Sequence, residues 1–172
     1  MLTGDGVCHL RLSGRVMQMG NLVVRKGDKI NVPVPTMPLV PTWVTPVIVT
    51  LDGTGGFSAG GQVVCIPQDI ENISPETVAQ YNAPATLGAP SAPGSGKIKF
   101  TLAAGHKARQ TNTKGNPVVV NDNSPMSYTF TPDTPAQFIP PGGTNPVADP
   151  TPVYSGQATF QLNPMPKPVN AG

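Results

Sequence analysis

Apolar and polar residues alternate most clearly between Ser95 and Pro132, and this stretch anchors the predicted fold. Over Lys97–Leu102, three apolar residues alternate strictly with three polar ones. Such alternation is typical of a strand with one buried face. Further strands are predicted over Pro117–Asn121 and Met126–Thr131, and the Asn and Asp side chains of Asn121–Pro125 favour a tight turn between them. The three segments predict a three-stranded antiparallel meander.

The rest of the chain contains short strand patterns separated by glycine and proline. They cover Val7–Leu12, Arg15–Met19, Asn21–Arg25, Ile30–Val34, Val47–Leu51, Gln62–Ile66 and Tyr154–Leu162. The mostly β-branched run Val47–Leu51 is expected to be buried on both faces, and Lys26–Lys29 predicts a hairpin turn. Ser74, Pro75 and Glu76 predict the start of a helix that ends by Tyr81 or Asn82. Because short strands at close spacing pair antiparallel, we expect an all-β fold, an antiparallel β-sandwich or barrel with long Pro/Gly-rich loops and one short helix.

Composition limits the architecture further. The 172 residues include 19 glycines and 22 prolines, and only 12% are charged, which excludes a protein built from long helices. Proline lacks an amide donor and therefore interrupts strand ladders. We expect a single β domain at 1–163 with an extended loop at 132–152, followed by a Pro-rich C-terminal tail at 164–172. Trp43, the only tryptophan, is expected to pin a second extended loop, Pro33–Pro46, to the core.

Basic residues gather in one stretch, although the net charge is only +2. No acidic residue interrupts this stretch, and its cations are Lys97, Lys99, Lys107, Arg109 and Lys114. The small net charge argues against a nucleic-acid binder. The stretch predicts a solvated, lysine-protected sheet face or, where one surface gathers these cations, a contact for an acidic partner protein.

Neither a membrane span nor a secretion signal is predicted. No apolar run approaches the ~20 residues of a membrane-spanning helix, and Met1–Leu10 lacks the basic start and apolar core of a signal peptide. We therefore expect synthesis in the bacterial cytoplasm. In that reducing compartment Cys8 and Cys65 are expected to be small buried residues, with a disulfide between them as the alternative.

Candidate catalytic chemistry is sparse. Gly56–Gly60, GFSAG, matches a nucleophile elbow around Ser58, but no helix pattern follows it, so we favour a plain glycine loop over a serine hydrolase. The donors Cys8, His9, Cys65 and His106 lack the paired spacing of a structural zinc site, and neighbouring strand residues point to opposite faces. His106 is expected on a surface loop. The sequence predicts no enzyme, no catalytic residue, no metal and no cofactor.

Five segments of the second half carry a family resemblance. They are VCIPQD at Val64–Asp69, GSGKIKFTL at Gly94–Leu102, HKARQTNTKGNPVVV at His106–Val120, PDTPAQ at Pro132–Gln137 and DPTPVYSGQATF at Asp149–Phe160. These segments resemble small β proteins encoded with phage-tail-like contractile injection systems, where they accompany PAAR-type spike tips and other particle components. The resemblance implies a structural role in a phage-like particle and supplies no catalytic residue.

The sequence also departs from the PAAR tip. That tip carries repeated Pro-Ala-Ala-Arg segments and a metal near its point, and this chain has neither the repeat nor such a ligand set. We therefore expect a tail, baseplate, cap or capsid-surface subunit rather than the tip itself. Phage decoration proteins are similar in kind, because they are small and β-rich with proline-rich arms.

Extended proline-rich arms are the expected partner contacts, because extended segments are stabilised when they lie against another subunit. The arms are Pro33–Pro46, Pro132–Pro152 and Pro164–Gly172. The predicted partner-binding residues are Pro33, Pro35, Trp43, Lys97, Lys99, Lys107, Arg109, Pro140, Pro141, Pro166 and Pro168. The partners are expected to be other protein subunits of a multimeric particle present in many copies or as a homo-oligomer.

A stand-alone carbohydrate-binding or adhesive β-sandwich is the competing hypothesis. Its stacking residues would be Trp43, Tyr81, Tyr128 and Tyr154. Binding of the purified monomer to a glycan array would separate the two hypotheses.

Overall fold

A computed structural model of the chain describes residues 21–34, 41–73, 78–164 and 170–171. Sixteen strands and two short helical turns lie within these ranges. The strands are β1 (Asn21–Val23), β2 (Lys29–Val32), β3 (Thr42–Trp43), β4 (Val47–Thr50), β5 (Ser58–Ala59), β6 (Gln62–Val63), β7 (Val78–Asn82), β8 (Ala89–Ala92), β9 (Gly94–Thr101), β10 (Lys107–Thr113), β11 (Asn116–Asn121), β12 (Met126–Thr134), β13 (Gln137–Ile139), β14 (Val147–Ala148), β15 (Tyr154–Gln161) and β16 (Asn170–Ala171). The helical turns are α1 (Gln68–Glu71) and the 3-10 turn η1 (Ala104–His106). The predicted all-β class is confirmed.

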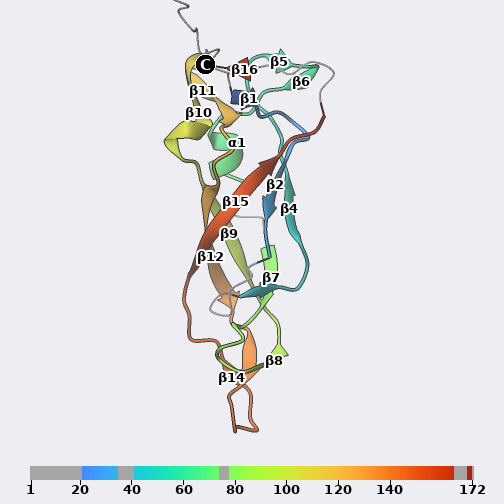
Figure 1. Ribbon diagram of the computed structural model, residues 1–172, viewed down its shortest axis with the longest axis vertical. Coiled ribbons are helices and arrows are strands. Elements are labelled where there is room, and N and C mark those ends of the chain that lie inside the picture. Colours follow the sequence, from blue (N-terminus) through green and yellow to red (C-terminus); the bar gives the residue numbers. More distant parts are fainter. Residues whose placement is uncertain (1–20, 35–40, 74–77, 165–169, 172) are drawn as a thin grey trace, which may run out of the picture.

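The molecule is elongated, broad at one end and tapered to a point at the other (Figure 1). Its body is a seven-stranded antiparallel sheet in the order β3-β7-β9-β12-β15-β2-β4. The two edge strands β3 and β4 follow each other in the chain and are separated only by residues 44–46. This short connection brings the edges of the sheet toward each other, so the body is a nearly closed barrel.

The body encloses an aromatic core. In β9, Ile98 and Phe100 are buried while Lys97 and Lys99 are exposed, as the alternation predicts. Phe130 of β12 lies opposite Ile98 in the ladder and packs edge-on against Trp43, with ring centroids 5.0 Å apart. Trp43 is 4% exposed. The expectation that this residue fixes its segment to the core is therefore confirmed.

A second sheet, in the order β10-β11-β1-β16, forms the broad end together with the β5–β6 hairpin (Figure 1). It has a small apolar cluster of its own, made of Val23, Ala59, Val64, Ala108, Val118 and Val120. A third sheet, in the order β14-β13-β8, forms the pointed end. The two ends of the barrel are thus closed by different sheets.

The predicted meander is wrong in its middle strand. β9 and β12 are direct neighbours, whereas β11 pairs with β10 and β1 in the broad-end sheet. The cause is local, because a two-residue turn folds β10 back onto β11. The tight turn predicted after β11 is confirmed, because Asn123 has a φ of 63° and its amide donates to the Asn121 side chain.

Three other expectations are corrected. Lys26–Lys29 contains a turn, but β1 and β2 on either side of it belong to different sheets and form no hairpin. Val78–Asn82 is strand β7 rather than the end of a helix, because its alternate residues pack into the barrel; residues 74–77 lie outside the described ranges. In the Val47–Leu51 run, Ile48 is 50% exposed, so this segment is not buried on both faces.

Candidate functional site

The pointed end is built largely from residues 132–152, which we expected to form an extended loop. Residues 132–152 contain the end of β12 together with β13 and β14, and residues 84–96 contain β8. β13 pairs with both β8 and β14. The connection between β13 and β14 carries the consecutive residues PPGGTNP at 140–146, of which 141–146 are exposed. The prolines of this segment therefore stiffen the point of the molecule itself.

A buried carboxylate holds the pointed end together. Asp149 is 4% exposed, and its carboxylate accepts hydrogen bonds from the hydroxyls of Tyr154 at 2.5 Å and Tyr81 at 3.1 Å. The Thr151 amide donates to the same carboxylate at 3.0 Å. The Tyr81 hydroxyl in turn accepts from the Ala136 amide. These contacts tie β7 and β15 of the barrel to the segment that leads into β13.

Burial and the nearby carboxylate also affect the two tyrosines. Desolvation, with a further contribution from the charge of Asp149, raises the pKa of Tyr81 to about 12. Desolvation and the hydrogen bond to Asp149 raise the pKa of Tyr154 as well. Both hydroxyls therefore remain protonated donors at neutral pH, which is the state that the Asp149 carboxylate requires.

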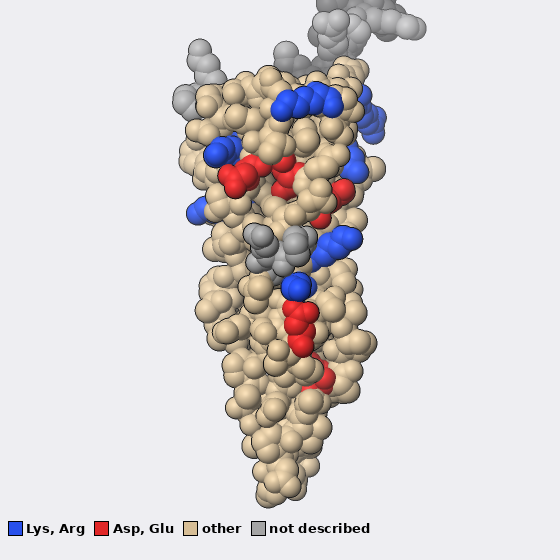
Figure 2. All heavy atoms as spheres, turned by 180° about the vertical axis from the view of Figure 1, so that it is seen from behind, with Lys and Arg blue, Asp and Glu red and all other residues tan. Residues whose placement is uncertain are grey.

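The surface of the pointed end is free of charge. Residues 83–96 and 134–148 contain no Asp, Glu, Lys, Arg or His. Figure 2 shows the consequence: on the face that it displays, the cationic and anionic side chains lie over the broad half and the middle of the molecule, and the narrow tip has none. Sequence analysis missed this end, although two long uncharged segments were the signal that could have found it.

Charged residues of the broad end are mostly neutralised within the chain. Lys26 pairs with Asp52, and Lys107 pairs with Glu71, each at 3.7 Å. The predicted basic run is divided between sheets, with Lys97 and Lys99 on β9 of the body and Lys107 and Arg109 on β10. Lys114 lies in the turn between β10 and β11, and Lys97 pairs with Asp133 on the body. The run therefore does not form one basic surface.

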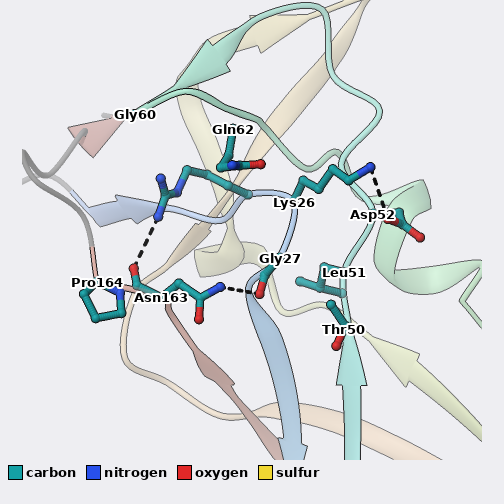
Figure 3. Close-up of a pocket in the computed structure, with 10 residues that line it drawn as sticks. Lys26, Gly27, Thr50, Leu51, Asp52, Gly60, Gln62, Asn163 and Pro164 are labelled. Atoms are coloured by element: carbon teal, nitrogen blue, oxygen red, sulfur yellow. Dashed lines mark hydrogen bonds and ion pairs between the residues drawn. The ribbon is translucent and has the colours of Figure 1, made fainter.

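Arg25 joins three segments at the broad end. It is 3% exposed, and its guanidinium donates to the main-chain oxygens of Ala59 and Asn163, each at 3.2 Å. The buried Asp28 carboxylate accepts from the main-chain amides of Arg25 and Asn163, each at 2.8 Å. A cavity of about 370 Å³ lies beside this corner (Figure 3). We interpret the cavity as the seam where these segments meet.

The predicted partner-binding residues lie in different places. Pro33 and Pro141 are exposed, Pro140 is half-buried, and Trp43 is buried in the core. Pro35, Pro166 and Pro168 lie outside the described residues. Pro140 and Pro141 belong to the pointed end, far along the molecule from β16, which pairs with β1 at the broad end. The described members of this set therefore do not form one site.

The aromatic residues that a glycan-binding module would need are buried. Trp43, Tyr81, Tyr128 and Tyr154 are 4%, 0%, 5% and 8% exposed. Their rings pack against one another or against Phe130. No ring face of these four residues is available to stack on a sugar, and this finding counts against the carbohydrate-binding alternative.

The hydrolase alternative lacks the geometry that it needs. Ser58 is exposed in β5, and Gly60 and Gly61 turn the chain directly into β6, so a strand rather than a helix follows the serine. His106 is fully buried, which corrects its expected surface position. Its Nδ1 accepts from the Ala103 amide, and its Nε2 lies 3.0 Å from the Ser124 main-chain oxygen. Both ring nitrogens are therefore engaged by main-chain groups.

Cysteine and metal chemistry contribute no site within the described ranges. Cys65 is buried, and desolvation raises the pKa of its thiol. Cys8 and His9 lie outside these ranges, so the expectation of two unpaired cysteines, with a disulfide as the alternative, stays a prediction. Among the described residues, no three His, Cys, Asp or Glu side chains cluster as metal ligands. The helices found there are too short to cross a membrane.

Comparison with known proteins identifies the family. No curated protein matches the chain. A family model described as contractile injection system spike tip protein matches residues 17–172, which is nearly the whole chain. The match confirms the resemblance to contractile injection system components, and it corrects our preference for another particle component over a tip. The chain belongs to the family of contractile injection system spike tip proteins.

Proposed function

We propose that this chain forms the leading point of the spike of a contractile injection system, with its pointed end outward and its broad end seated on the next spike subunit. The taper toward an uncharged point is the observation that carries this orientation. An uncharged surface loses little hydration free energy when it is pressed into another phase, whereas a charged surface loses much. The role is structural and requires no catalytic residue.

Rigidity supports the same orientation. The pointed end combines a three-stranded sheet, a proline-rich turn and the buried network of Asp149. Proline restricts the backbone, and a satisfied buried network specifies one conformation. A leading point has to keep its shape under load, and these features provide that stiffness.

Accessibility of single cysteines in the assembled particle tests the orientation. In a Cys8→Ser background, Thr144→Cys places a thiol at the exposed pointed end and Ser58→Cys places one at the exposed broad end. Both should react with a maleimide in the isolated chain. In intact particles Thr144→Cys should still react, and Ser58→Cys should be protected. The reverse pattern would show that the pointed end faces inward.

The Pro-rich C-terminal tail remains a proposed contact with the neighbouring subunit. Its last described residues, Asn170 and Ala171, pair with β1 at the broad end, where the proposal places that neighbour. Deletion of Pro164–Gly172 should lower incorporation into particles. Pro140 and Pro141 lie at the opposite end, so their replacement should leave incorporation unchanged. Full incorporation of the deletion variant would contradict the tail contact.

A further inference from the structure

Two hairpin turns at the broad end form one preformed surface. The first is the segment Phe57–Gln62, and the second is the turn Lys114–Gly115; together we call them the docking face. All of these residues except Ala59 are exposed, and Phe57 is 39% exposed. An aromatic side chain on an otherwise small and polar surface is a typical anchor of a protein interface.

Close packing holds the docking face in one conformation. The Gly56 amide donates to the Thr113 hydroxyl at 2.6 Å, and the Lys114 ammonium donates to the Thr54 main-chain oxygen at 3.0 Å. A Cβ atom added to Gly56 would lie 2.7 Å from the Thr113 hydroxyl. A larger residue at position 56 would therefore have to displace Thr113 of the β10–β11 hairpin. A partner that binds this face has little conformational entropy to remove.

The charge left over at the broad end is positive. Every carboxylate that the structure describes there already has a partner within the chain, namely Asp28, Asp52, Asp69, Glu71 and Asp122. Lys29, Arg109 and Lys114 have no carboxylate within ion-pair distance among the described residues. Three of these carboxylates form ion pairs, whereas Asp69 and Asp122 accept hydrogen bonds from neutral groups and keep their charge. The three cations without an ion pair therefore outnumber these two acids by one, and the small positive excess favours an acidic surface.

Lys114 also has an unfavourable backbone conformation. Its φ is 49° and that of Gly115 is 78°, as the two central residues of a type I′ hairpin turn require. Asn or Gly is favoured at the first of these positions, and the equivalent turn of the β5–β6 hairpin has Gly60 there. A lysine at this position places an ammonium on the docking face at the cost of backbone strain, and such outliers often mark functional positions.

We propose that the docking face binds an acidic surface on the neighbouring spike subunit, with Phe57 as the apolar anchor and Lys114 as the ionic contact. This inference rests on the proposed function, which seats the broad end on that neighbour. Lys114 lies beside Gly56, the residue before the anchor, because its side chain passes within 3.4 Å of a Cβ built on Gly56. Desolvation by Phe57 then strengthens the ion pair that Lys114 forms with the partner.

Reconstitution of particles that lack this chain tests the proposal. The probe is the tip-less particle, incubated with purified full-length chain and analysed for bound chain after sedimentation. Lys114→Asn removes the charge and relieves the turn, so its Tm should equal or exceed that of the wild type. Its apparent Kd should rise about tenfold, and the salt dependence of its binding should be weaker than that of the wild type. Phe57→Ala should raise the apparent Kd about tenfold or more.

Lys99→Gln is the matched control, because Lys99 is an exposed cation on β9 without an ion-pair partner in the described part of the chain. It removes the same charge away from the docking face and should leave the apparent Kd unchanged. Equal losses for Lys99→Gln and Lys114→Asn would overturn the proposal in favour of non-specific attraction. If Lys114→Asn keeps wild-type affinity while Phe57→Ala loses affinity, the proposal of an acidic partner surface is overturned. The proposal that the broad end sits on the neighbouring subunit would then stand.

Other results separate this inference from the proposed function. Wild-type affinity for both docking-face variants, together with labelling of Ser58→Cys in intact particles, would refute the orientation itself. Self-association of the isolated chain that depends on Phe57 and Lys114 would assign the face to a second copy and would overturn the proposal. Loss of binding by both variants with their Tm values retained is the result that we expect.

Discussion

The two ends of the molecule differ in the charge of their surfaces, although each buries a hydrogen-bonded carboxylate, Asp149 at the pointed end and Asp28 at the broad end. At the pointed end the surface is uncharged and a single carboxylate, Asp149, is buried inside. At the broad end exposed cations such as Lys114 lie on the surface. A buried carboxylate with several donors fixes a conformation, whereas surface charges select a partner and speed its association. The comparison indicates one end built for shape and one end built for recognition.

Removal of the buried carboxylate should have the largest effect. Asp149→Ala leaves the hydroxyls of Tyr81 and Tyr154 buried without their acceptor. The loss of a hydrogen-bonded buried charge should lower the free energy of unfolding by about 3 kcal/mol. Urea denaturation followed by tryptophan fluorescence measures this change, because Trp43 lies in the adjacent aromatic core.

Asp133→Ala is the control for this prediction. Asp133 pairs with Lys97 at 3.7 Å, and both side chains are half exposed. Exposed ion pairs contribute little, so this variant should change the free energy of unfolding by about 0.5 kcal/mol or less. Similar losses for Asp149→Ala and Asp133→Ala would show that the buried carboxylate does not organise the pointed end.

A glycine substitution at the pointed end should have the next largest effect. Gly88 has φ of 145°, and a Cβ atom built there would lie 2.1 Å from the Ile139 main-chain oxygen. Gly88→Ala should therefore force β8 and β13 apart and lower the free energy of unfolding by about 2 kcal/mol. Gly142→Ala in the exposed turn meets no atom within 4 Å. Its positive φ alone should cost about 1 kcal/mol, so equal Tm losses for the two variants would contradict close packing at Gly88.

Alternation alone was enough to predict part of the barrel. β9 buries every second residue, and β12 and β15 do so over most of their length. The apolar residues that define these strands, such as Phe100, Phe130 and Phe160, lie in the core. The prolines and glycines correctly indicated a short-stranded β protein. Local patterns therefore predict strands well where one face meets a core and the other meets water.

Pairing partners and the pointed end could not be predicted, because they depend on contacts between distant segments. β11 joins β1 from the other end of the chain, and β8 joins β13 across about fifty residues. Val78–Asn82 has strand alternation, but the apparent helix start before it favoured the wrong element. The hydrogen-bond network of Asp149 has no sequence motif, because one of its tyrosine donors, Tyr81, lies 68 residues away in the chain.

Alkaline titration should affect the pointed end first. The chain has three tyrosines, and burial raises the pKa of each, to about 12 for Tyr81. Unfolded tyrosines ionise at about pH 10. Because the unfolded chain then binds fewer protons than the folded one, stability should fall as the pH rises from about 10 toward 12.

Absorbance at a tyrosinate band should show almost no phenolate in the native protein at pH 10 and about half ionisation in the urea-unfolded chain. Native ionisation at pH 10 would contradict the buried network.

Acid titration should affect the broad half, and this is the smallest effect that we expect. Burial works to raise the pKa of the Asp122 carboxyl, but hydrogen bonds from the hydroxyl and amide of Ser124, with His106 nearby, hold that pKa below its usual value. The folded chain therefore binds this proton less readily than the unfolded chain, whose Asp titrates at about pH 4. The stability that Asp122 provides is present above about pH 4 and is lost as the pH falls through the lower folded pKa.

Asp122→Asn should flatten the decline of Tm with acidification, whereas Asp133→Asn should leave that decline as steep as in the wild type. If the Tm of Asp122→Asn falls with acidification in parallel with that of the wild type, the Asp122 carboxylate does not contribute to the pH dependence of stability.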